Sequence, residues 1–245
     1  MKIPKIIHQT YYDKASLSLE LNNNIKHLKK INKDWEYRFY DNKDIINFIS
    51  LNYEIEVLNK VNLINPKYGV VLADLFRYLL LYKVGGVYLD IKSSVQKPLD
   101  EIIKDDDVYL ISQWKNKIGE KFEGYGILPL LKKIPGGEFQ QWFIVSEPNH
   151  PFLLSVIKNV LFNIENYSIQ TFGVGHFGVM LTSGPVIYTL AIAPLLKKNN
   201  YRIIDSEDSG LVYSIYGNGN GHLKLFKQNY RESQEPIIMI SPTRQ

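Results

Sequence analysis

Hydrophobic and polar residues follow two different spacings along the chain. Apolar residues recur every three or four positions in segments typical of amphipathic helices, and they alternate with polar residues or form short runs in segments typical of strands. The spacing predicts helices over 16–31, 43–50, 53–61, 68–83, 151–164 and 183–196. It predicts strands over 3–7, 35–40, 87–89, 108–112, 142–146, 202–205 and 211–215.

These helices and strands alternate from one end of the chain to the other. Such alternation is typical of an α/β fold in which helices flank a mostly parallel central sheet. We find no internal repeat, low-complexity tract or linker in residues 1–245, so we expect a single domain. Glycine and lysine are frequent over 115–138, which we expect to leave the sheet as an excursion or a lid.

The predicted helix over 68–83 is apolar on nearly all sides. Between Val70 and Tyr82 only Asp74 and Arg77 are charged, and a helix of this composition is expected to be buried. Asp74 and Arg77 are three positions apart and therefore lie on one face of the helix. Buried charges are kept when they are paired or bound to a ligand. The pair either ties the helix down or meets a ligand, with Arg77 binding an anionic or hydroxylated group and Asp74 accepting from sugar hydroxyls; the two roles are compatible.

A glycine pair and an aspartate follow this helix. Gly85-Gly86 ends the helix, because glycine readily adopts the left-handed cap conformation, and the strand over 87–89 leads into Asp90. Ligands of open α/β sheets bind beyond the carboxyl ends of the strands, which makes Asp90 a candidate site residue. On an extended segment Asp90 and Lys92 would share a face. A carboxylate there can hold a divalent cation, or it can merely begin a turn.

Composition narrows the class of function. The net charge is +4 and the lysines are scattered, so we expect an anionic small ligand and no nucleic acid. The chain has no cysteine, which excludes disulfides and thiolate chemistry. The first residues lack the apolar region of a signal peptide, and we find no stretch near the ~18 apolar residues of a membrane span. We expect a cytoplasmic protein without an integral membrane segment, and peripheral membrane association stays open.

Three segments resemble the DXD-containing glycosyltransferase family. They are the opening Ile-Pro-Lys-Ile-Ile-His-Gln-Thr over 3–10, the motif from Ala73 to Asp90 with its helix, Gly-Gly and strand, and Ser183-Gly184-Pro185. That family includes initiating mannosyltransferases and capsular-polysaccharide transferases and is distantly related to the glucosylating clostridial toxins. The resemblance covers 1–12 and 66–98 strongly and 140–190 more weakly.

The resemblance implies a GT-A-like fold and the transfer of a sugar from a UDP- or GDP-sugar to a glycan, polysaccharide or other hydroxyl acceptor, with retention of configuration. It assigns the nucleotide to the first strand, the donor sugar to Asp74 and Arg77, and the first aspartate of DXD to Asp90. The complete set of implied donor-binding residues is Ile7, His8, Gln9, Asp74, Arg77, Tyr88, Asp90, Ser183 and Gly184.

Lys92 departs from the family pattern, because it stands where the second aspartate of DXD is expected. A Mn²⁺ or Mg²⁺ ion can still be held by Asp90, the diphosphate and a residue such as His222 or Asn220. Alternatively, Lys92 itself neutralises the departing diphosphate, or the site is inactive. We expect a working enzyme in which Asp90, Asp74, Arg77 and Lys92 are catalytic, with a metal slightly favoured.

Two other functions remain open at this stage. One is a degenerate module that binds a nucleotide-sugar or a glycan without turnover, and the other is a transferase that modifies protein side chains. Several weaker candidates also have structural alternatives. His8 is either a nucleotide contact or a capped structural histidine, His176 lies in a predicted glycine-rich loop, and the acidic run 105–107 is expected to be a solvated turn.

Overall fold

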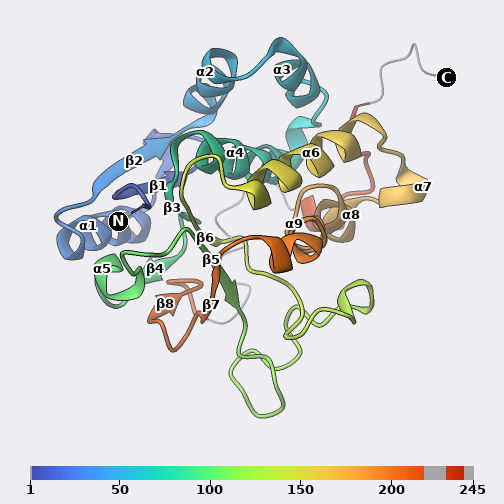
Figure 1. Cartoon of the computed structure of the whole chain (residues 1–245). Coiled ribbons are helices and arrows are strands. Elements are labelled where there is room, and N and C mark those ends of the chain that lie inside the picture. The colour runs from blue at the N-terminus through green and yellow to red at the C-terminus, as the bar shows by residue number, and fades with distance from the viewer. Residues whose placement is uncertain (1, 218–229, 240–245) are drawn as a thin grey trace.

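A central sheet carries the residues singled out above. The computed structural model describes residues 2–217 and 230–239, and in this part of the chain a six-stranded sheet has the order β2-β1-β3-β6-β5-β7 (Figure 1). Its strands are β1 (Ile6–Thr10), β2 (Glu36–Tyr40), β3 (Gly86–Leu89), β5 (Tyr109–Gln113), β6 (Phe143–Ser146) and β7 (Arg202–Asp205). The short strands β4 (Ser94–Val95) and β8 (Leu211–Val212) form a separate antiparallel ladder.

The predicted mostly parallel sheet is confirmed. Strand β1 pairs in parallel with β2 and β3, and β5 pairs in parallel with β7. Strand β6 is antiparallel to both of its neighbours, β3 and β5. The amino-terminal end of β6 therefore lies at the same edge of the sheet as the carboxyl ends of β3 and β5.

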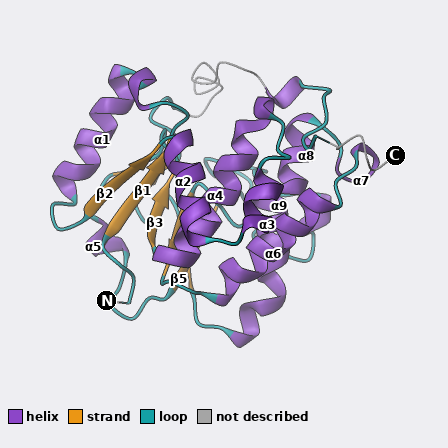
Figure 2. Ribbon diagram, turned by 90° about the horizontal axis from the view of Figure 1, so that it is seen from above, coloured by secondary structure: helices purple, strands orange, loops and turns teal. Residues whose placement is uncertain are grey.

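Helices cover both faces of the sheet (Figure 2). The helices are α1 (Leu19–Ile31), α2 (Asn42–Asn52), α3 (Ile55–Val61), α4 (Gly69–Val84), α5 (Leu99–Ile102), α6 (Pro151–Glu165), α7 (Ile169–Phe172), α8 (Gly175–Thr182) and α9 (Pro185–Ile192). Short 3₁₀ turns occupy Lys14–Ser16, Pro66–Tyr68, Pro129–Leu131, Ala193–Lys198 and Tyr230–Glu232.

The alternation of side chains along the strands divides the core in two. Val87 and Leu89 of β3 pack with residues of α1 and α5, whereas Tyr88 points to the opposite face and packs with α4, α6 and α9. Successive strand side chains point to opposite faces, so one short apolar strand serves both layers. This explains why β3 reads as a continuous apolar run.

The segment from α4 to β3 follows the sequence prediction closely. Helix α4 is buried on most sides and ends at Gly85, whose φ of 72° is in the left-handed region. Gly86 has a φ of 100°, and a Cβ at this position would lie 2.7 Å from the carbonyl oxygen of Ile6 on β1. Glycine is therefore required here by both the backbone conformation and the close approach of β1.

Several boundaries differ from the sequence expectations; the strand predicted over 211–215, for example, spans only Leu211–Val212. The first strand spans Ile6–Thr10 rather than 3–7, because a turn closed by the Ile6 amide and the Pro4 carbonyl precedes it. The helix predicted over 183–196 is α9 followed by a 3₁₀ turn, and Gly184 is the N-cap residue of α9. Ser183 instead ends α8, a helix that replaces the expected glycine-rich loop around His176.

One apolar stretch, Gly175–Lys198, is long enough to be compared with a membrane span, which corrects the expectation that no stretch comes near that length. It is divided between α8, α9 and the 3₁₀ turn that follows. Half of its most apolar window is buried inside the protein. By length and composition alone this is weak evidence for a span, because core helices share these properties.

Candidate functional site

Asp90 lies directly after β3, at the carboxyl edge of the sheet, as predicted. Its amide donates to the carbonyl of Trp142 at 2.9 Å, and its own carbonyl accepts from Gln9 Nε2 at 3.1 Å. Segments on both sides of β3, at Trp142 and at Gln9, thus fix the backbone at this point. Its side chain is 23% exposed, so the carboxylate remains open to a ligand.

Arg77 joins two carboxylates. Its Nη2 lies 3.0 Å from Asp74 Oδ1, and its Nη1 lies 3.1 Å from Asp90 Oδ1. The same Nη1 donates to the carbonyl of Gln141 at 2.8 Å, and the guanidinium lies over the ring of Tyr88 at 4.6 Å. A planar guanidinium has enough fixed donors to meet several partners at once. Arg77 therefore holds Asp90 relative to α4.

Asp74 is the buried end of this chain of contacts. Its Oδ2 accepts from Ser183 Oγ at 2.9 Å, and Gln141 Nε2 donates to its Oδ1 at 3.3 Å. Burial raises the pKa of Asp74 to about 7, against the opposing effect of the Arg77 guanidinium. A carboxylate so enclosed keeps its charge only through its partners.

Exposure separates the roles of the three residues. The side chains of Asp74 and Arg77 are 1% and 5% exposed, and their polar atoms already have protein partners. Asp90 is the member that solvent reaches. The structure thus brings the predicted residues together, with Asp74 and Arg77 placed to position Asp90. Direct contacts of these two residues with a donor sugar stay a prediction.

Lys92 does not share an extended face with Asp90, which corrects the sequence expectation. Strand β3 ends at Leu89, and the Ser93 amide donates to the Asp90 carbonyl at 2.8 Å to close a turn. Lys92 is buried in this turn. Its Nζ donates to the Tyr213 hydroxyl at 3.1 Å and lies 4.3 Å from the centre of the Tyr213 ring. An ammonium has three donors, so further donors remain for an anion.

The described residues do not by themselves form a divalent cation site, and the expected metal stays a prediction. In residues 2–217 and 230–239, no group of three histidine or acidic side chains is close enough to hold a metal. Asp90, the accessible carboxylate of the Asp74–Arg77–Asp90 group, is already paired with Arg77, and Lys92 places a positive charge nearby in sequence. Divalent cations of this class prefer several oxygen ligands. The suggested ligands His222 and Asn220 lie outside the described residues.

The first strand is occupied by structural contacts. His8 is fully buried; its Nε2 lies 3.0 Å from the Gly85 carbonyl oxygen and its Nδ1 lies 3.2 Å from the Tyr40 hydroxyl. These partners assign the proton to Nε2 and make Nδ1 an acceptor. Burial lowers the pKa of His8 to about 4, so the ring is neutral. This geometry favours the structural alternative for His8.

Ile7 and Gln9 are also buried. Ile7 belongs to the core, and Gln9 links β1 to Asp90 while its Oε1 accepts from the Tyr37 hydroxyl at 2.8 Å. Tyr88 is buried as well and shares a hydrogen bond with Thr10 at 2.9 Å. A nucleotide that uses these side chains would have to displace existing partners. Their assignment to the donor stays a prediction.

Sequence reasoning missed two side chains that surround the site. Gln141 contacts both Asp74 and Arg77, and it precedes β6 in a polar Gln140-Gln141 pair that could have signalled a role. Tyr213, whose hydroxyl accepts a hydrogen bond from Lys92, lies 121 residues from Lys92 in sequence, and no local sequence pattern indicates this contact. Tyr213 belongs to an aromatic cluster with Trp114, Phe122 and Trp142.

Two weaker candidates have structural explanations. Asp107 accepts from Arg202 Nε at 2.8 Å, so at least this member of the acidic run is buried in an ion pair rather than in a solvated turn. His176 lies on α8, and partial burial lowers its pKa.

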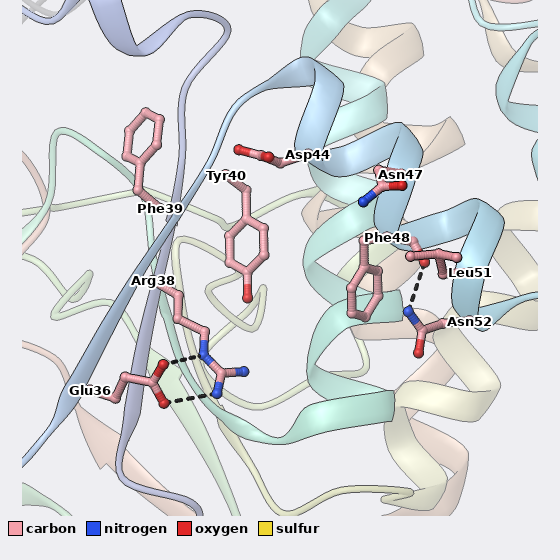
Figure 3. A pocket seen from close by; sticks show the side chains of 9 residues that line it. All are labelled: Glu36, Arg38, Phe39, Tyr40, Asp44, Asn47, Phe48, Leu51 and Asn52. Atoms are coloured by element: carbon pink, nitrogen blue, oxygen red, sulfur yellow. Dashed lines mark hydrogen bonds and ion pairs between the residues drawn. The ribbon is translucent and has the colours of Figure 1, made fainter.

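A further open pocket of about 410 Å³ lies between β2 and α2 (Figure 3). Arg38 and Glu36 form a two-pronged ion pair on one side, with both contacts at 2.8 Å, and Phe48 of α2 lines the other side. Of its lining residues, Tyr40 contacts the His8 ring, and Arg38 and Phe39 pair with His8 and Gln9 across the sheet. The pocket belongs to the edge of the sheet.

Comparison with known proteins shows which family and which relatives this chain resembles. Residues 18–109 match the family described as "Glycosyltransferase sugar-binding region containing DXD motif". The chain is 26% identical over 164 residues to inositol phosphoceramide mannosyltransferase 1 of Schizosaccharomyces pombe, covering 65% of this chain and 43% of that protein. It is 29% identical over 223 residues to an uncharacterised glycosyltransferase, L373, of Acanthamoeba polyphaga mimivirus, covering 89% and 76% of the two chains. The chain thus spans less than half of the length of the yeast relative.

A solved structure supports the fold. The PaToxG glycosyltransferase aligns with a TM-score of 0.55 and 17% sequence identity, covering 80% of this chain and 70% of that one. At this identity the likeness concerns the fold, which is GT-A-like.

Proposed function

We propose, on the premise that the chain belongs to the glycosyltransferase family with a DXD-containing sugar-binding region, that it transfers a sugar from a nucleotide-diphosphate sugar to a hydroxyl acceptor. The observation that carries the proposal is the chain of contacts Ser183–Asp74–Arg77–Asp90, which ends in the one accessible carboxylate at the carboxyl edge of β3. Several curated relatives are named mannosyltransferases, so GDP-mannose is the first donor to test.

The reaction is driven by stabilisation of the departing diphosphate. The bond between the sugar C1 and the diphosphate oxygen breaks, the acceptor oxygen forms a new bond to C1, and the acceptor proton passes to the leaving group. Fixed positive groups aimed at developing negative charge contribute most of the catalysis in such reactions. We assign this role to Lys92, whose Tyr213 partner holds the ammonium in place.

Asp90 has a different role, since Arg77 fixes its carboxylate 3.1 Å from the guanidinium. A carboxylate held in this way is oriented to accept hydrogen bonds from sugar hydroxyls. It is a weak nucleophile because its charge is already compensated. We therefore propose front-face attack by the acceptor with retention at C1, a step that isolation of a covalent glycosyl-enzyme would contradict.

The proposal is tested by donor hydrolysis. Purified protein is incubated with UDP- and GDP-sugars, GDP-mannose first, and the released nucleotide diphosphate is measured. We expect release from one donor and a decrease of about a hundredfold in Asp90→Asn. Asp34→Asn is the matched control, because Asp34 is exposed and lies outside the site.

The outcomes distinguish the alternatives. Binding of a nucleotide-sugar without release of nucleotide, with or without an added oligosaccharide acceptor, would replace the transferase by a binding module. Equal rates of donor hydrolysis in Asp90→Asn and Asp34→Asn would show that Asp90 takes no part in the reaction. Transfer to a protein side chain in preference to a saccharide would leave the proposed transfer reaction in place and would replace only the proposed acceptor.

A further inference from the structure

The segment between β5 and β6 exposes large apolar side chains to water. The Ile118 side chain is 93% exposed, the highest value among the large hydrophobic residues described. Tyr125, Ile127 and Leu130 of the same segment are about half exposed. In Figure 1 this light-green segment leaves the sheet after β5 and extends away from it. Four large apolar side chains exposed within one short segment make this loop a candidate site of interaction.

These side chains project from an ordered loop. The Gly124 amide donates to the Asn116 carbonyl at 2.9 Å, and the Glu138 amide donates to the Gly126 carbonyl at 3.0 Å. Asn116 Nδ2 holds the loop together by donating to the Tyr125 carbonyl at 2.7 Å, and Leu131 anchors it in the protein. The exposure of the apolar side chains is therefore built into the backbone of the loop.

Exposed lysines are interspersed with the apolar side chains along this segment. The exposed lysines of the segment are Lys117, Lys121, Lys132 and Lys133. Its acidic side chains are turned to the backbone, since Glu120 accepts from the Lys117 amide at 2.7 Å and Glu123 accepts from the Gly119 amide at 2.9 Å. Lys121 pairs with Glu207 at 3.1 Å. In the described part of the chain the other three lysines have no acidic partner within 4.0 Å.

We propose that residues 117–133 are a docking surface for a bilayer that contains anionic lipid. Peripheral binding of this kind combines burial of apolar side chains at the boundary between headgroups and acyl chains with attraction of nearby lysines to anionic headgroups. Each lysine near such a surface adds to this attraction. Isolated apolar side chains interleaved with lysines suit a fluid, negatively charged surface, whereas a protein partner fits a contiguous apolar patch.

The docking surface adjoins the site. Phe122, at the base of the loop, lies 6.4 Å from Tyr213 between ring centres, and Tyr213 holds Lys92. The docking surface is thus linked to the site through this aromatic contact. Binding to the bilayer does not depend on the proposed transfer reaction. A negative result for one proposal therefore does not contradict the other.

The test is flotation of the purified chain with vesicles of phosphatidylcholine, with and without phosphatidylserine. We expect binding to the vesicles that contain phosphatidylserine, weakened by high salt because the surface charges are exposed. The combined variant Ile118→Ser, Ile127→Ser and Leu130→Ser should lower the bound fraction about tenfold. The combined variant Lys117→Glu, Lys132→Glu and Lys133→Glu should abolish the preference for phosphatidylserine.

A matched control uses exposed apolar residues elsewhere on the surface. Leu19→Ser, Leu51→Ser and Ile55→Ser together remove side chains that are at least 59% exposed, and this variant should bind like the unaltered chain. Circular dichroism and the thermal midpoint establish that each variant is folded. Absence of binding to both kinds of vesicle, or equal loss in the control, would overturn the proposal. A concentration-dependent dimer that only the Ile118 variant disrupts, without vesicle binding, would assign the surface to a second copy of the chain.

Discussion

Arg77 and Asp90 are joined by a contact of 3.1 Å between Nη1 and Oδ1, although Arg77 lies in the middle of a buried helix and Asp90 beyond the end of a strand. The same guanidinium contacts Asp74 at 3.0 Å. Because Arg77 belongs to the buried helix α4, its contact with Asp90 fixes the position of the Asp90 carboxylate relative to α4. Its loss would disturb Asp90 and leave Asp74 as a buried charge without its partner.

Arg77→Lys tests this positioning role. A lysine ammonium is a point charge and cannot meet both carboxylates with the geometry of a guanidinium. We expect the rate of donor hydrolysis to fall about a hundredfold, and the free energy of unfolding to decrease by about 2–4 kcal/mol because a buried ion pair is broken. Denaturant titration and nucleotide release measure the two effects.

Arg38→Lys is the control for this substitution. Arg38 is paired with Glu36 at the exposed edge of β2, and exposed pairs contribute at most about 1 kcal/mol. It should leave both activity and stability nearly unchanged. If Arg77→Lys behaved like Arg38→Lys, Arg77 would not position Asp90.

Lys92 provides the next prediction. If its ammonium stabilises the departing diphosphate, the unaltered chain should retain donor hydrolysis in EDTA, and Lys92→Met should lower the rate about tenfold to a hundredfold. Lys92→Asp restores the second carboxylate of the DXD pattern and should make the remaining activity depend on Mn²⁺. Nucleotide release is measured with EDTA and with added Mn²⁺ for all three proteins. Complete inhibition of the unaltered chain by EDTA would show that a metal, not Lys92, carries this role.

The arrangement around Asp90 was predictable because its signals are local. An apolar helix, a Gly-Gly stop and a strand that ends in aspartate all lie within one continuous stretch of sequence, and each has a direct structural cause. The sheet is built from such alternating units, so its class also followed from the sequence. The pairing of Asp74 with Arg77 followed from their spacing of three positions on one helix.

Contacts between distant segments were not predictable in this way. The orientation of Lys92 depends on Tyr213, which no pattern near Lys92 indicates. The segment around His176 was expected to be a loop because it is rich in glycine, yet α8 contains Gly178. A Cβ there would lie 2.7 Å from the Ile237 side chain, so close packing rather than flexibility explains this glycine.

Gly86 and Gly69 offer a paired test of backbone requirements. In Gly86→Ala the new Cβ would meet the Ile6 carbonyl at 2.7 Å, and the φ of 100° is unfavourable for alanine. We expect the free energy of unfolding to decrease by about 2–4 kcal/mol. Gly69 lies at the start of α4 with open space around it, so Gly69→Ala should be neutral or slightly stabilising. Thermal and denaturant unfolding measure both, and equal effects of the two substitutions would contradict the close approach of β1.

His8 gives a prediction for the dependence of stability on pH. Burial lowers its pKa to about 4 from the ordinary 6.5, so between these values the unfolded chain binds a proton at His8 and the folded chain does not. The contribution of His8 to stability is therefore complete above pH 6.5 and is lost as the pH falls to 4. His8→Gln keeps an amide donor for the Gly85 carbonyl but cannot titrate. The stability advantage of the unaltered chain over His8→Gln should shrink by up to about 3 kcal/mol between pH 7 and pH 4. Denaturant titrations of both proteins across this range measure it, and a difference that stays constant would mean that folding does not change the pKa of His8.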